Sequence, residues 1–207
     1  MFSFLKKNPL DFKDNVAIVN ILSINLVENA FEASASDYEA WSKFDETLSQ
    51  IPLSRDQIFE ASYYFWIFNL SHLYICMVKN CREYGDKKFE PFGELVFSKI
   101  YTESKIHFVQ YAKRTFETNY FIFVLPSDEE ILDNILRLAR LPMLNEGGFD
   151  FDSKSSIGET YYKYLNVMKF DTDPKMRRAI FKHKINTIEK IMEAYAEALT
   201  MMRKNMR

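Results

Sequence analysis

Glycine, proline and cysteine are all scarce in this chain, and each scarcity excludes a class of structure. Only 5 glycines and 6 prolines occur among 207 residues, too few for the many tight turns of a β-rich fold. The two cysteines, Cys76 and Cys81, share one predicted helix and point about 140° apart on it at 100° per residue. They cannot pair within that helix, so the sequence predicts no disulfide framework.

Motifs for metals and cofactors are also missing. The three histidines, His72, His107 and His183, are too scattered for the ligand spacing of zinc or di-iron sites. The stretch from Asp150 to Lys154 begins like a calcium loop but lacks the glycine and glutamate that such a loop requires. No phosphate-binding loop, dinucleotide fingerprint or serine-hydrolase elbow occurs. The sequence therefore predicts no metal site and no bound cofactor.

Apolar residues and helix-start signals are abundant. Hydrophobic residues make up 47% of the chain and aromatic residues 16%, enough to build a sizeable core. Four serines are each followed three residues later by Glu or Gln and head an apolar-periodic run, the pattern of a capping box. These pairs are Ser36/Glu39, Ser54/Gln57, Ser127/Glu130 and Ser156/Glu159. A further start is predicted at Asp173-Pro174.

Together these signals predict an all-α fold, a single-domain bundle of six to seven helices over residues 1–207 that ends in a long C-terminal helix. The expected helices are 11–33, 36–50, 54–84, 91–120, 127–141, 156–170 and 174–205. Residues 142–155 form the longest predicted loop, a candidate hinge or lid. Residues 119–125 are rich in β-formers and are compatible with either a last helical turn or an extended stretch.

Residues 61–78 form the most hydrophobic run, long enough to approach the span of a bilayer. Polar side chains interrupt the run, and charged residues follow it directly. We therefore interpret it as a buried central helix and expect no membrane partner. The N-terminus lacks the features of a secretory signal, which predicts a cytoplasmic protein.

Charge is unevenly distributed, although the formal net charge is only −2. Residues 173–207 contain nine Lys and Arg against four Asp and Glu, whereas the rest of the chain is acidic. No aromatic residues interleave with the basic cluster in the way that nucleic-acid stacking requires. We interpret the charges as a solvated helix face, expect no DNA partner and disfavour an RNA partner.

The last predicted helix carries a heptad seam. Its apolar residues are spaced alternately four and three apart, the period of coiled-coil packing. They are Phe181, Ile185, Ile188, Met192, Tyr195, Leu199, Met202 and Met206. The seam packs either within the chain's own bundle or against a partner, including a second copy of the chain. As partner-binding residues we select Phe181, Ile188, Met192, Tyr195, Leu199 and Met202.

Residues 178–183 fit the spacing Arg-x4-His. This short pattern resembles that of the all-helical HEPN ribonuclease superfamily, in which an Arg and a His from two protomers meet across a dimer interface. The resemblance covers six residues and implies catalytic roles for Arg178 and His183 in metal-independent RNA cleavage. Ala179 departs from it, because that family usually has a polar residue there. The structural alternative is a solvated Arg178 and a partly packed His183.

The sequence thus predicts a non-enzymatic protein-interaction or regulatory module, with a homodimer as one form. Two alternatives are a HEPN-like ribonuclease and a small-molecule sensor with an aromatic-lined pocket. The sensor pocket would be lined by Tyr63, Tyr64, Trp66, Tyr74, Tyr161, Tyr162 and Tyr164.

Overall fold

The computed structural model describes residues 13–42, 54–79, 89–116, 124–142, 155, 157–160, 163, 189–202 and 204. Its helices are α1 (Lys13–Ser42), α3 (Arg55–Tyr74), the π-helical turn η2 (Ile75–Lys79), α5 (Glu90–Phe116) and α6 (Asp128–Arg140). Residues 157–160 and 189–202 are also helical. No strand occurs in these described ranges, so the predicted all-α class is confirmed there.

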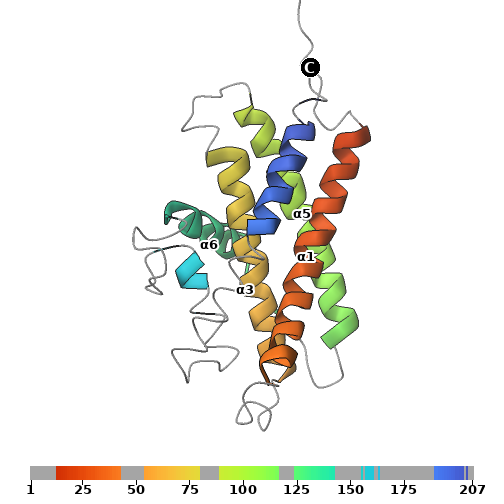
Figure 1. The fold of residues 1–207 in the computed structure, drawn as a ribbon, viewed down its shortest axis with the longest axis vertical. Coiled ribbons are helices and arrows are strands. Elements are labelled where there is room, and N and C mark those ends of the chain that lie inside the picture. The colour runs from red at the N-terminus through yellow and green to blue at the C-terminus, as the bar shows by residue number, and fades with distance from the viewer. Residues whose placement is uncertain are drawn as a thin grey trace, which may run out of the picture.

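The helices pack around α3. Figure 1 shows α1, α3 and α5 running side by side, with α6 on the side of α3 away from α1. Helix α1 contacts both α3 and α5, and α3 also contacts α6. The helix at 189–202, blue in Figure 1, lies along α1 and α3. Helix α3 is therefore enclosed by its neighbours, and most of its residues from Ala61 to Leu73 are buried, as expected for a buried central helix.

Two of the predicted capping boxes are present. Ser54 accepts a hydrogen bond from the Gln57 backbone N–H, and the Gln57 side chain accepts one from the Ser54 backbone. Ser127 and Glu130 do the same at the start of α6. Each box satisfies two N–H groups that a helix start leaves without a partner.

The helix start predicted at Ser36 is wrong. Helix α1 continues without interruption from Lys13 to Ser42, so Ser36 lies in its interior. No glycine or proline ends the helix in this range. The nearby Ser34 hydroxyl donates to the Ala30 carbonyl at 2.9 Å, which shows how a serine is accommodated inside this helix.

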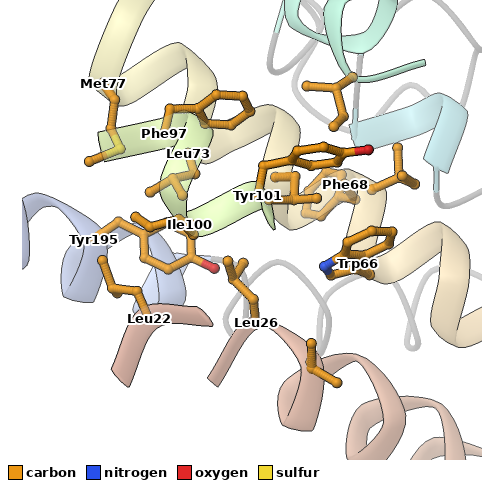
Figure 2. Close-up of a cluster of buried hydrophobic side chains, with 14 of the residues drawn as sticks. Leu22, Leu26, Trp66, Phe68, Leu73, Met77, Phe97, Ile100, Tyr101 and Tyr195 are labelled. Atoms are coloured by element: carbon orange, nitrogen blue, oxygen red, sulfur yellow. The ribbon is translucent and has the colours of Figure 1, made fainter. Parts of the chain in front are cut away.

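The core joins α1, α3, α5 and the 189–202 helix. Figure 2 shows Leu22, Leu73, Ile100 and Tyr195, one from each of these helices, converging on one cluster. Trp66 is fully buried, and its indole N–H donates to Ser104 Oγ of α5 at 3.2 Å. This bond satisfies the one polar atom of a side chain that otherwise contributes only apolar area.

The crossing of α5 over η2 depends on a glycine. A Cβ atom on Gly93 would lie 2.1 Å from the Met77 carbonyl oxygen, a backbone atom that cannot move aside cheaply. Any larger residue at position 93 would push α5 away from η2, so Gly93 sets how closely the two helices approach.

Candidate functional site

A small cavity with both polar and apolar walls forms where three parts of the chain meet on the side of α3 opposite α1. Helix α3 contributes Tyr63, Tyr64 and Ile67, α6 contributes Asn134, Arg137 and Leu138, and the later residues Thr160 and Lys163 complete the lining. We call the cavity that these eight residues surround the notch. Its side chains come from segments far apart in the sequence, so it exists only in the folded chain.

The helix at 157–160 is anchored by a serine. The Gly158 N–H donates to Ser155 Oγ and the Glu159 N–H to the Ser155 carbonyl, both at 2.9 Å. The sequence predicted this cap one residue later, at Ser156, which lies outside the described residues. Ser155 is buried, so this cap lies inside the structure rather than at its surface.

An ion-pair network frames the notch. Arg137 Nη1 donates to both carboxylate oxygens of Glu159, at 2.5 and 2.6 Å, and Lys163 Nζ lies 3.1 Å from Glu159. Lys163 also lies over the Tyr64 ring, 5.4 Å from its centroid. Burial raises the pKa of the Glu159 carboxyl, but the bonds from Arg137 and Lys163 outweigh this, and the pKa lies below its ordinary value. Glu159 is therefore ionised at neutral pH.

Two hydroxyl groups in the notch are buried without a hydrogen-bond partner. They are Tyr63 Oη and Thr160 Oγ1, and Thr160 is only 6% exposed. Burial raises the pKa of Tyr63 to about 12, although the nearby Asn134 amide acts in the opposite sense without reaching hydrogen-bond geometry. Tyr63 therefore keeps its proton at neutral pH and presents an O–H donor. An unsatisfied buried hydroxyl is destabilising, which makes this pair the most unusual feature of the site.

The notch is small. Its volume is about 20 Å³, enough for about one water molecule or one ligand atom. The sensor hypothesis predicted an enclosed pocket for a whole small molecule, typically about 300 Å³ or more. Tyr63 and Tyr64 do line a cavity, but one far smaller than that hypothesis requires. Trp66 is packed against Phe108 at 4.8 Å between ring centroids, and Tyr74 against Phe97 at 5.2 Å. Tyr161, Tyr162 and Tyr164 lie outside the described residues.

The seam residues selected for partner binding fall into two groups. Phe181 and Ile188 lie outside the described residues. Tyr195, Leu199 and Met202 are buried in the chain's own core, and Met192 is half-buried against it. This burial favours packing of the seam within the chain, one of the two arrangements that the heptad spacing allows. The proposed catalytic pair, Arg178 and His183, also lies outside the described residues.

The described part of the chain contains no group of metal ligands and one segment that is apolar enough to cross a membrane. No group of three His, Cys, Asp or Glu side chains there is arranged to hold a metal ion. Cys76 is a free thiol, and burial raises its pKa to about 11. One described segment, Lys13–Ala35 of α1, is long and apolar enough to cross a membrane, with mean hydropathy 1.3. Core helices of water-soluble proteins and signal sequences near an N-terminus have the same properties, and 39% of the most apolar window of this segment is buried.

Sequence reasoning missed most of the notch. It placed Tyr63 and Tyr64 near a pocket, but Asn134, Arg137 and Lys163 have no local pattern that distinguishes them from other helix-surface residues. The Ser156/Glu159 pattern predicts a capping role for Glu159, whereas its carboxylate pairs with Arg137. Comparisons with protein-family models, with curated proteins and with solved structures gave no match.

Proposed function

We propose that this chain is a non-enzymatic, cytoplasmic interaction module, and that the notch is its contact point with a protein partner. The observation that carries the proposal is the pair of buried, unpartnered hydroxyls of Tyr63 and Thr160 in one cavity. A buried hydroxyl without a partner destabilises a folded protein, and a polar group that enters the cavity relieves that cost.

The size of the notch supports a macromolecular partner over a free small molecule. About 20 Å³ admits one functional group of a larger ligand rather than a whole metabolite. Arg137 and Lys163 at its mouth are 40% and 38% exposed, so they remain accessible from solvent. A side chain of a docked partner fits these features, because only its tip has to enter.

We further infer that the helices form one bundle of six to seven helices, which the long C-terminal helix completes. Support comes from the packing of α1 against α3 and α5, and from Tyr195, Leu199 and Met202, which join the same core. A seam used inside the bundle leaves the notch as the better-supported contact surface.

A site-specific photocrosslinker tests this function. We would replace Tyr64 by p-benzoylphenylalanine in cells that express the chain and irradiate them. We expect one dominant adduct with another protein. The same crosslinker at Ile21, which is 57% exposed on α1, away from α6, provides the control and should not give that adduct. No adduct at Tyr64, or the same adducts from both positions, would overturn the proposal.

A further inference from the structure

We propose that the notch binds a carboxylate group. One carboxylate oxygen enters the cavity and accepts hydrogen bonds from the hydroxyls of Tyr63 and Thr160, while Arg137 and Lys163 face its charge at the mouth. This inference rests on the proposed function, because it names the chemical class that the same site recognises.

Hydrogen-bond direction at the notch requires an acceptor. A tyrosine hydroxyl that retains its proton has to direct that proton at an acceptor, and none among the described residues reaches hydrogen-bond geometry with Tyr63. Thr160 is more than nine-tenths buried, and its hydroxyl has no partner either. Both line the same cavity. A single atom that accepts two hydrogen bonds, such as a carboxylate oxygen, would satisfy both hydroxyls.

The charged side chains around the notch decide where an anionic ligand is stabilised. Two cations, Arg137 and Lys163, share one carboxylate, that of Glu159. Two further acids lie near the tyrosines and keep their negative charge, because their donors are neutral: Glu60 accepts from the Tyr64 hydroxyl at 3.3 Å, and Glu130 accepts from the Ser127 backbone at 2.9 Å. An anionic ligand is therefore stabilised only where it meets Arg137 and Lys163, at the mouth of the notch.

Arg137 still has donors available at the mouth of the notch. Arg137 uses Nη1 for Glu159, whereas its Nη2 makes only a long bond of 3.5 Å to Asn134 Oδ1. That bond is at the limit of hydrogen-bond geometry and is easily exchanged for a shorter, charge-assisted one. A bound carboxylate would place its second oxygen near these donors, outside the cavity.

The size of the notch limits which chemical group can enter it. A cavity of about 20 Å³ accepts a single oxygen atom. A carboxylate is planar and can insert one oxygen while the other stays at the mouth. A phosphate that inserted one oxygen would leave three outside the cavity, with only Arg137 and Lys163 to face them. The geometry therefore favours a carboxylate over a phosphate.

Calorimetric titration of the full chain tests the inference. The probes are N-acetylglutamic acid α-amide, its glutamine isostere, acetate and inorganic phosphate. We expect saturable binding of the glutamate probe, weaker but detectable binding of acetate, and no binding of the glutamine probe. Tyr63→Phe and Thr160→Val each remove one donor at nearly constant shape, and each should weaken the glutamate probe at least about tenfold.

Two variants provide matched controls. Tyr74→Phe removes a hydroxyl from the same helix away from the notch, and Thr200→Val removes one whose donor is already bonded to the Ala196 carbonyl at 2.8 Å. Neither should change the affinity for the glutamate probe.

Three results would overturn the carboxylate inference: equal binding of the glutamate and glutamine probes, preferential binding of phosphate, or unchanged affinity in Tyr63→Phe and Thr160→Val. Failure of the inference differs from failure of the proposed function. An adduct at Tyr64 that persists while the glutamate probe does not bind would leave a protein-binding notch of other chemistry, whereas loss of that adduct would remove the function itself.

Discussion

Single residues of α3 show how much polarity this core tolerates. Asn69 and His72 are each only 1% exposed, and Asn69 Nδ2 and His72 Nε2 have no hydrogen-bond partner. His72 Nδ1 lies 2.9 Å from the Phe68 carbonyl, so Nδ1 carries the proton and Nε2 presents a bare lone pair. Burial lowers the pKa of His72 to about 4, which keeps the ring neutral at pH 7.

The neutral His72 predicts a specific acid sensitivity. Between its ordinary pKa of 6.5 and about 4, the unfolded chain takes up a proton at His72 that the folded chain does not. The free energy of unfolding should therefore fall as the pH drops through this window, by up to about 3 kcal/mol from this residue. Urea unfolding at pH 7, 6 and 5 measures the effect.

The variant His72→Leu isolates the contribution of that ring. It should flatten the pH dependence between pH 6.5 and 4, because no proton is taken up at position 72. A variant that loses His107 instead, and so keeps His72, serves as the control and retains the His72 contribution. An equally steep fall in His72→Leu would contradict the assignment.

At the scale of elements, helix starts could be predicted where the signal is local and the preceding chain is not helical. Ser54 and Ser127 meet both conditions, and both boxes form as the sequence predicted. Ser36 carries the same residue pattern but follows a chain that is already helical, so the helix continues through it. A capping box predicts a helix start only where the preceding residues are not already helical.

This difference gives a test by substitution. Ser127→Ala removes the side-chain acceptor for the Glu130 N–H and should lower the free energy of unfolding by about 1 kcal/mol. Ser36→Ala places a better helix former inside α1 and should change stability by no more than about 0.5 kcal/mol, in either direction. Urea unfolding of both variants gives the comparison. Equal losses would mean that Ser36 also caps a helix in solution.

At the scale of the whole molecule, the sequence indicated the core better than the site. The hydrophobic run at 61–78 predicted a buried central helix, and Trp66 and Leu73 within it are fully buried. The notch could not be predicted in the same way. The notch residues Tyr63, Arg137 and Thr160 come together through the packing of three separate segments. No residue spacing along the chain predicts that they lie close together.

The terminal helix allows a prediction at this scale. Leu199 is buried at 8% exposure, whereas Met201, two residues on, is 55% exposed. Leu199→Asp places an unpaired charge in the shared core and should lower the free energy of unfolding by about 3–5 kcal/mol. Met201→Asp should cost little. Thermal unfolding and sedimentation of both variants measure stability and mass together. A change in mass without a loss of stability in Leu199→Asp would indicate a seam between chains instead.

The central claim is that Tyr63 and Thr160 keep unpaired hydroxyls for a ligand, and urea unfolding of Thr160→Val, with and without N-acetylglutamic acid α-amide, tests it most directly. Removing a hydroxyl that has no partner should leave the variant at least as stable as the natural chain. The probe should stabilise the natural chain by mass action and fail to stabilise the variant. A variant that is less stable by about 1 kcal/mol or more, yet is stabilised by the probe as strongly as the natural chain, would contradict the claim.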